Sequence, residues 1–153
     1  MEGITCYEGW MATARFDVLT PLSPREVLAV LTDFTDRRPQ IYGNIDQAHF
    51  RVHGQGPGWA DVTEGNALAW ERNRYDWDDS AGTVSVKAVE SNTWASGSGW
   101  QYRLTTDVGG TRVDVSLIRI PRTVRGRLIA ALIPLLGRRV LRADLLRVLS
   151  RVH

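Results

Sequence analysis

Two glutamates, Glu71 and Glu90, are the strand residues best suited to acid–base chemistry in this chain. Both fall in segments where apolar and polar residues alternate, so either carboxylate could be turned toward a buried face. A carboxylate in apolar surroundings can act as a general base, as proton abstraction during a ring closure requires. The alternative is a structural ion pair between neighbouring strands. We treat both glutamates as candidates for catalysis and leave the two interpretations open.

Aromatic residues form the larger set of candidates. Six tryptophans in 153 residues exceed what one core requires, and most of them stand on expected strands. Such side chains either pack in the core or form a stacking wall for a ligand, which a few polar groups then orient. The aromatic candidates for ligand contact are Tyr42, Tyr75, Trp77, Trp100 and Tyr102, and the polar ones are Glu71, Arg72, Asn73, Arg74 and Glu90.

Metal and nucleotide sites are not expected. His49 and His53 fall on the same side of an expected strand, but a metal site needs a third ligand that the sequence does not supply. Cys6 is the only cysteine, which excludes a multi-cysteine metal centre and an internal disulfide. Because the sequence also lacks a Ser/His/Asp arrangement and a glycine-rich phosphate loop opening a helix, no cofactor is predicted.

The elements that must position these side chains are mainly strands. From Met11 onward apolar and polar residues alternate as in a half-buried strand. Ser23, Pro24 and Glu26 then supply an N-cap, a proline at the first helical position and a capping-box carboxylate. A helix is expected there, followed by a second short helix near Pro39. Six further strands, with hairpin-length connections typical of one antiparallel sheet, are expected at 48–53, 59–63, 68–77, 83–91, 94–106 and 111–120.

The strand expected at 68–77 decides which polar groups face the core. Its two sides differ in chemistry, and either side could bring a charged group inward. One side holds Trp70, Arg72, Arg74 and Asp76, and the other holds Glu71, Asn73, Tyr75 and Trp77.

The C-terminal segment, from Pro121 to about Val152, has a helical pattern. Pro134 cannot donate a backbone hydrogen bond, so a bend is expected there. Because 128–136 is apolar nearly all round, a second contact besides the sheet is expected, either a homodimer partner or a ligand. Leu128 and Leu132 are the candidates for ligand contact. The apolar stripes are Val124, Leu128, Leu132 and Leu135 first, then Leu141, Leu145, Val148, Leu149 and Val152.

Charge is distributed unevenly along the chain. Residues 119–153 carry nine arginines and one acid, a charge of +8, while residues 1–118 carry −6. One interpretation is a solvated helix face; the other is a partner with acidic or phosphate groups, which arginine binds through planar bidentate contacts. An anionic membrane surface and a partner chain are weighed here, and nucleic acid is not expected.

Length and composition indicate a single globular domain. Hydrophobic residues make up 43% and charged residues 24%, which excludes a disordered or fibrous chain. The longest apolar run, 128–136, is too short to cross a bilayer, and the N-terminus lacks the pattern of a secretory signal, so a cytoplasmic location is expected. Because Met11 opens the first strand, residues 1–10 are interpreted as an N-terminal extension and 11–153 as one domain.

The order of strand, two short helices, six antiparallel strands and long C-terminal helix resembles the helix-grip fold of the START/polyketide cyclase-like superfamily (SRPBCC). The resemblance covers about residues 11–152, and its blocks are similar to those of actinobacterial members. The segments that carry it are FDVLTPLSPREVLAVLTDF, RRPQIYG, WERNRYDW, GSGWQYRLT, GGTRVDV and RGRLIAALIPLLGRR.

The resemblance implies an α+β fold in which a curved seven-stranded antiparallel sheet packs its concave face on the C-terminal helix, with a hydrophobic cavity between them. Members use such cavities to bind, transfer or cyclise aromatic, polyketide or lipid-like molecules, without an invariant catalytic motif. The expected function is binding of a small hydrophobic or aromatic molecule. The alternatives are a cyclase or dehydratase with Glu71 or Glu90 as base, and binding of a partner or an anionic surface through the arginine-rich helix.

Overall fold

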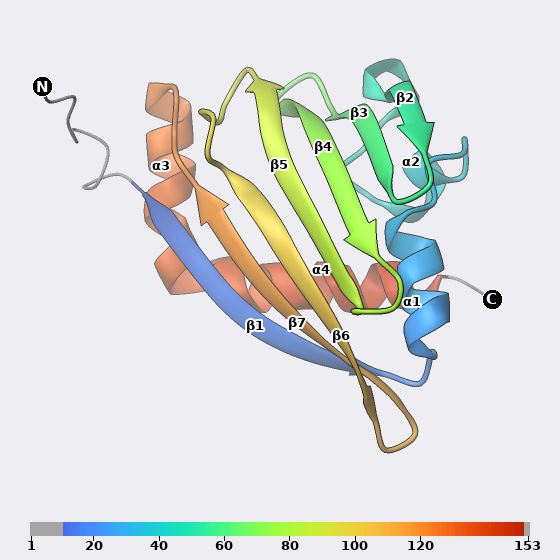
Figure 1. Ribbon diagram of the computed structural model, residues 1–153. Helices are drawn as coiled ribbons and strands as arrows, with labels where there is room; N and C mark the ends of the chain where they lie inside the picture. Colours follow the sequence, from blue (N-terminus) through green and yellow to red (C-terminus); the bar gives the residue numbers. More distant parts are fainter. Residues whose placement is uncertain (1–10, 152–153) are drawn as a thin grey trace, which may run out of the picture.

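The computed structural model describes residues 11–151, which form one curved antiparallel sheet with helices packed on one of its faces (Figure 1). The strands lie in the order β1-β7-β6-β5-β4-β3-β2, so β2 to β7 pair successively and β1 closes against β7. The extension expected at 1–10, with Cys6, lies outside the described residues, as do Val152 and His153. The strands are β1 (Ala12–Thr20), β2 (Arg51–Gly56), β3 (Trp59–Gly65), β4 (Trp70–Asp78), β5 (Thr83–Ser91), β6 (Gly99–Asp107) and β7 (Gly110–Arg119).

The first strand confirms the expected alternation. Its residues are buried and exposed in strict turn, because successive side chains of a strand point to opposite faces. β1 pairs with β7 over its whole length, from Ala12 opposite Arg119 to Thr20 opposite Thr111. This register places Arg119 on the inner face of the sheet, beside the apolar residues of β1.

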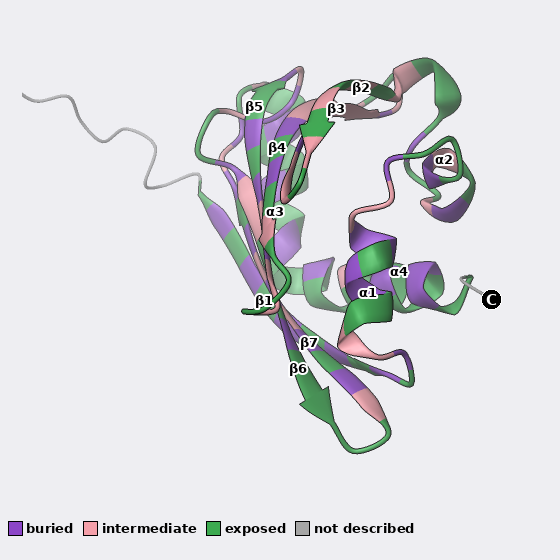
Figure 2. Cartoon of the chain, turned by 45° about the vertical axis from the view of Figure 1, so that its right-hand side comes forward, coloured by how far each residue is buried: buried purple, intermediate pink, exposed green. Residues whose placement is uncertain are grey.

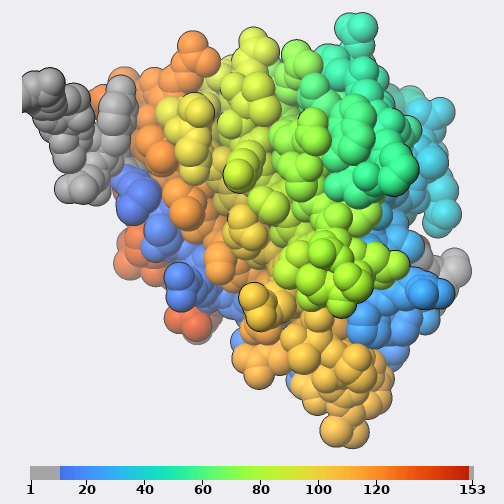
Figure 3. Space-filling view, in the orientation of Figure 1, coloured from blue at the N-terminus to red at the C-terminus, as the bar shows by residue number. Residues whose placement is uncertain are grey.

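The two short helices after β1 are also confirmed. Helix α1 (Pro24–Leu31) begins at the N-cap Ser23, whose Oγ accepts a hydrogen bond from the Glu26 backbone N–H at 3.2 Å. Helix α2 (Arg38–Ile41) follows after a short connection and carries a proline in its first turn. Figure 2 shows α1, α2 and α4 on the same side of the sheet. The opposite face of the sheet, toward the viewer in Figure 3, is formed by the strands alone.

The C-terminal helix is bent where Pro134 predicts a bend. It consists of α3 (Val124–Leu132), a π-helical turn at Ile133–Gly137 and α4 (Arg138–Ser150). Figure 1 shows α3 and α4 running in clearly different directions. The stripe through Leu145, Val148 and Leu149 is buried as expected. The region described contains no helix that is long and apolar enough to span a membrane.

Except for Leu132, the first stripe of the C-terminal segment does not face the sheet. Leu128 is 66% exposed, and Val124 and Leu135 are also exposed. The buried positions of α3 are instead Gly126 and Ala130. The physical reason is close approach: a Cβ on Gly126 would stand 2.8 Å from the carbonyl oxygen of Thr93, so only a small residue fits there.

Two expected strands, those at 48–53 and 94–106, begin three or more residues later than their hydropathy suggests. Before β2, residues Gln47–His49 form a 3₁₀ turn, because the Asp46 side chain accepts a hydrogen bond from the His49 backbone N–H at 2.9 Å. β2 then continues through Gly54 and Gly56, where the absence of side chains makes room for the Trp59 ring. Likewise, 92–98 is a loop, with Gly97 at a φ of +100°, and β6 starts only at Gly99.

The facing of β4 is settled by burial. Asn73 and Tyr75 are buried while Arg74 and Asp76 are exposed, so the side with Glu71, Asn73 and Tyr75 faces inward. In β5 the pairing with β4 shifts register between the partners of Arg72 and Asn73, and this irregularity leaves Glu90 exposed, opposite Arg72.

The core consists of two clusters of buried residues. The larger lies under α1 and α4, with Val18, Val27 and Val113 fully buried. The smaller lies under α3 and the π-helical turn and contains Ala12, Ala14, Trp94, Leu117, Ala130 and Ile133. Trp100 and Leu141 pack against both clusters.

Candidate functional site

A cavity of about 780 Å³ lies between the inner face of the sheet and the C-terminal helices. Its apolar wall includes Phe16, Val84, Val86, Leu117, Ile133 and Leu145. Four further apolar residues line it while remaining between 39% and 53% exposed, so they mark its open side; these are Ile129, Leu132, Leu136 and Val140. The bend in the C-terminal helix brings residues of both α3 and α4 to this opening.

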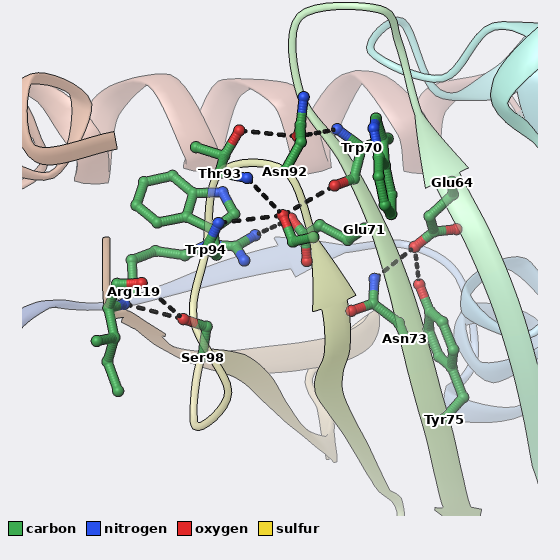
Figure 4. Close-up of polar contacts among 12 residues, drawn as sticks. Glu64, Trp70, Glu71, Asn73, Tyr75, Asn92, Thr93, Trp94, Ser98 and Arg119 are labelled. Atoms are coloured by element: carbon green, nitrogen blue, oxygen red, sulfur yellow. Dashed lines mark hydrogen bonds and ion pairs between the residues drawn. The ribbon is translucent and has the colours of Figure 1, made fainter. Parts of the chain in front are cut away.

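An ion pair between Arg119 and Glu71 is built into the cavity wall (Figure 4). Nη2 of Arg119 lies 2.9 Å from Oε1 of Glu71, and the two side chains are 8% and 15% exposed. The guanidinium also lies 5.1 Å from the ring centroid of Trp94 and 5.2 Å from that of Trp100. Such cation–π contacts hold the planar guanidinium in place. The pair therefore adds two fixed polar groups to the cavity but no net charge.

Three buried polar atoms at this wall have no hydrogen-bond partner among the described residues: Glu71 Oε2, Asn73 Oδ1 and Arg119 Nη1. Asn73 is only 3% exposed, and its Nδ2 donates to Oε1 of Glu64 at 3.4 Å. Figure 4 shows its oxygen turned away from Glu64. Buried polar atoms are nearly always hydrogen-bonded, so this cluster offers two acceptors and one donor to a bound molecule.

The loop after β5 holds Trp94 against Arg119. The hydroxyl of Ser91 accepts hydrogen bonds from the backbone N–H groups of Thr93 at 3.0 Å and Trp94 at 3.1 Å, and donates to the carbonyl of Trp70 at 2.8 Å. Asn92 Oδ1 accepts from the backbone N–H of Trp70 at 3.0 Å. These contacts, drawn in Figure 4, tie the loop to the start of β4 beside Glu71.

A second buried network stands deeper in the cavity around Arg38, which is 2% exposed. Its Nε donates to Oε2 of Glu64 at 2.8 Å, and its Nη2 donates to the hydroxyl of Tyr75 at 3.0 Å. Its Nη1 donates to the carbonyls of Leu31 at 3.2 Å and Asp33 at 3.0 Å. The Tyr75 hydroxyl donates to Oε1 of Glu64. Every charged atom of this network is paired, so it is a structural anchor between α2, β3 and β4.

The tyrosines of the cavity stay uncharged. Burial, reinforced by the nearby Glu64 carboxylate, raises the pKa of Tyr75 well above its usual value. Burial also raises the pKa of Tyr42, although Arg38 partly opposes this shift, and it raises the pKa of Tyr102. At neutral pH the three rings therefore present phenol groups rather than phenolates.

Most of the candidate residues come together at this cavity. Tyr42, Asn73, Tyr75, Trp100, Tyr102 and Leu132 line it, and so does Glu71. The rings of Trp100 and Tyr102 are stacked, with centroids 6.3 Å apart and planes 12° apart, which gives the wall a flat aromatic surface.

Five candidates do not reach the cavity, and two of these, Arg72 and Arg74, lie on the outer side of β4, opposite the side that carries Asn73 and Tyr75. Trp77 faces inward but packs on Phe34, with ring centroids 6.2 Å apart, and so belongs to the core. Leu128 lies on the outer side of α3 because Gly126 and Ala130 take the inward positions. Glu90 is exposed on the outer face of the sheet because of the register shift in β5. Of the two proposed bases, only Glu71 can touch a bound molecule.

The histidines are placed elsewhere. Nδ1 of His49 lies 2.7 Å from Asp46 Oδ1, and Nε2 of His53 lies 2.7 Å from the Thr63 hydroxyl. Within residues 11–151, no three His, Cys, Asp or Glu side chains are grouped so as to hold a metal ion.

Sequence reasoning missed Arg38, Glu64 and Arg119. For two of them a signal existed: Glu64 continues the inward series Ala60 and Val62 of β3, and Arg119 follows the inward apolar residues of β7 at the same spacing of two. A charged residue in an inward register is the pattern to look for. Arg38 gives no such signal, because its burial depends on how α2 packs.

No model of a known protein family and no curated protein matches this chain. Solved structures do match it. The Zhui aromatase/cyclase from Streptomyces sp. R1128 is 16% identical, with 92% of each chain covered and a TM-score of 0.74. A protein from Thermus thermophilus is 16% identical, covering 92% of this chain and 96% of that one, with a TM-score of 0.72. A START superfamily protein from Mycobacterium smegmatis is 12% identical, covering 89% and 94%, with a TM-score of 0.67.

These likenesses extend over nearly the whole described chain and agree with the sheet order and the covering C-terminal helix. The chain therefore has a helix-grip fold similar to the folds of the aromatase/cyclase and of the START superfamily protein.

Proposed function

We propose that this protein binds a small apolar or aromatic molecule between the sheet and the C-terminal helices. The observation that carries the proposal is the cavity of about 780 Å³ with its mainly apolar and aromatic wall. Pockets for small molecules typically measure roughly 300–1,000 Å³ and combine such walls with a few polar groups. The likeness to an aromatase/cyclase supports the same class of ligand.

The wall favours flat molecules in particular. Trp100 and Tyr102 present parallel rings on which an aromatic ligand can stack. The open side, formed by residues such as Leu132 and Val140, gives access from solvent without rearrangement of the sheet. A ligand would therefore enter beside the C-terminal helices and come to rest against β4, β6 and β7.

The test uses phenylnaphthylamine, an uncharged aromatic probe whose fluorescence rises in apolar surroundings. We expect saturable binding to the wild-type chain. Leu132→Asp places a charge at the opening and should weaken probe binding about tenfold, because the charge must be desolvated when the probe enters. Leu128→Asp is the matched control, since Leu128 lies one turn away on the same helix, is exposed and does not line the cavity. The control should bind the probe as the wild type does.

Two results would overturn this function. One is the absence of probe binding to a chain that is folded by circular dichroism. The other is an equal loss in both variants, which would place the probe on the outside of α3. Native mass spectrometry of the purified protein gives an independent measure, because a co-purifying hydrophobic molecule would identify the class of natural ligand.

A second candidate function, attachment to an anionic membrane surface, is favoured by the outer side of α3. Val124 and Leu128 of α3 and Leu135 of the π-helical turn are between 66% and 77% exposed, and exposed arginines stand in the same stretch of chain, among them Arg127 of α3 and Arg139 at the start of α4. Apolar side chains flanked by basic ones suit a surface of anionic lipid. A dimer through this helix would instead bring two strongly positive segments together, so like charges oppose it.

Vesicle sedimentation tests this candidate. Anionic vesicles should retain the protein at low salt and release it at high salt, whereas zwitterionic vesicles should not retain it. Leu128→Ser should weaken retention, while Val108→Ser, at a fully exposed position on the β6–β7 turn, should not. Equal binding to both kinds of vesicle, or no binding at low salt, would remove the candidate.

A further inference from the structure

We propose that the molecule bound in the cavity carries an uncharged group that both donates and accepts hydrogen bonds, such as a phenolic hydroxyl or a carboxamide, and that Glu71, Asn73 and Arg119 recognise it. This inference rests on the proposed function and specifies which end of the ligand lies against β4 and β7.

The first step is the set of free atoms. Glu71 Oε2 and Asn73 Oδ1 can only accept hydrogen bonds, and Arg119 Nη1 can only donate. Asn73 is 3% exposed and Arg119 is 7% exposed, so bulk water does not provide hydrogen-bond partners for these atoms. Aliphatic and ether groups carry no donor and could satisfy neither acceptor, whereas a hydroxyl can donate to one of them and the NH2 of a carboxamide to both. A hydroxyl or a carboxamide supplies a donor and an acceptor within one small group.

The second step is charge. Arg119 is already neutralised by Glu71 at 2.9 Å, and the deeper Arg38 is neutralised by Glu64 at 2.8 Å. An anionic ligand would meet the free oxygen of Glu71, which repels it, and a cationic ligand would meet the guanidinium. The carboxylate of Glu71 and the guanidinium of Arg119 are close together and fixed. An uncharged polar group can therefore bind beside them without being repelled by either charge.

The third step is the geometry of the pair between Arg119 and Glu71, which leaves free two atoms that a purely structural ion pair would commonly use. Arginine and carboxylate commonly pair through two parallel hydrogen bonds, whereas one guanidinium nitrogen and one carboxylate oxygen are left free here. The Trp94 and Trp100 rings hold the guanidinium in this orientation. The free atoms thus stay available at the wall that also carries the stacked aromatic surface.

The test compares three ligands of one shape: a phenylnaphthol, its methyl ether and the corresponding phenylnaphthoate. The phenol is uncharged at neutral pH and both donates and accepts, the ether only accepts, and the carboxylate is anionic. In the wild type we expect the phenol to bind about tenfold more tightly than the ether, since it gains a hydrogen bond to a charged acceptor, and the carboxylate to bind most weakly.

Glu71→Gln gives the sharper result. This substitution keeps the shape of the side chain but leaves the charge of Arg119 uncompensated, so the carboxylate should become the tightest of the three ligands. Glu90→Gln is the matched control, because it removes the same charge from the outer face of the neighbouring strand and should leave the order unchanged. Circular dichroism and thermal unfolding establish that each variant is folded. The comparison of the three ligands on the wild type tests the proposal even if a variant does not fold.

The outcomes separate the two proposals. If neither phenylnaphthylamine nor any of the three ligands binds, the proposed function is wrong. If all three bind the wild type equally, or the carboxylate binds best, the cavity binds ligands but this recognition is wrong. The same order of affinities in Glu71→Gln as in the wild type would also overturn it.

Discussion

Arg119 and Glu71 form an ion pair although their strands, β7 and β4, are separated in the sheet by β6 and β5. β6 starts only at Gly99, opposite Ile118, so no residue of β6 pairs with Arg119 at the level of this contact. The pair thus connects distant parts of the curved sheet directly at the cavity.

Removing Arg38 should strongly destabilise the fold. Arg38→Met leaves the carboxylate of Glu64 buried without its partner, and breaking a buried pair in this way typically costs about 3–5 kcal/mol. Denaturant unfolding measures the loss. The control is Arg74→Met, which removes an exposed pair with Asp76 and should cost less than about 1 kcal/mol. Similar losses in the two variants would contradict the structural role of the Arg38 network.

Replacing Ser91 should loosen the loop that carries Trp94. Ser91→Ala leaves two buried backbone N–H groups, those of Thr93 and Trp94, without their acceptor, at a cost of about 1–3 kcal/mol. It should also weaken binding of the phenylnaphthol, because Trp94 helps to hold Arg119. Ser85→Ala, which removes only a hydroxyl bonded to Gln101 on the outer face, should change neither unfolding nor binding appreciably. Unchanged stability in Ser91→Ala would show that the loop has other anchors.

Alkaline pH should lower stability. Burial raises the pKa of Tyr75, and also those of Tyr42 and Tyr102, above the value of about 10 that tyrosine has in an unfolded chain. Below pH ~10 both states hold the proton and the stabilisation is complete. Above it the unfolded chain loses protons first, so the free energy of unfolding falls as pH rises. Denaturant unfolding from about pH 8 to about pH 11 checks the sign. Ionisation of all tyrosines near pH ~10 in the folded protein, seen by absorbance, would contradict it.

Gly126→Ala should destabilise the protein, although alanine is the better helix former by about 1 kcal/mol. An added Cβ would stand 2.8 Å from the carbonyl oxygen of Thr93 and force α3 away from the loop. We expect a loss of about 1–3 kcal/mol in thermal or denaturant unfolding. Gly43→Ala is the control, because a Cβ there meets no atom within 4 Å. A more stable Gly126→Ala protein would mean that α3 can shift outward freely.

Local sequence patterns predicted the fold well where each residue interacts with its near neighbours. The alternation in β1 and the N-cap at Ser23 needed no tertiary information, and Pro134 marked the bend by its missing N–H. The failures occurred where distant segments decide. The outward position of Leu128 follows from the contact between Gly126 and the Thr93 loop, and the outward position of Glu90 follows from a register shift.

The site was predicted in part for the same reason. The facing of β4 determines which of its residues can reach the cavity, and the structure turns Asn73 and Tyr75 inward. The sequence could not predict this facing, because the strand carries charges on both sides. The partners of those residues come from other elements, since Arg119 reaches Glu71 across two strands and Arg38 reaches Glu64 from a helix of four residues. Spacing along one strand does not contain that information.

The division of the core into two clusters has a consequence for motion. The smaller cluster beneath α3 has six buried members, and among residues 11–151 it shares with the larger cluster the two side chains Trp100 and Leu141, which pack against both. Regions with fewer buried apolar contacts open at a lower free energy than the global unfolding transition. Amide hydrogens of α3 should therefore exchange with solvent earlier than those of the central strands. Partial opening of α3 alone would widen the cavity and let a molecule too large for the resting aperture enter, while the rest of the sheet stays folded.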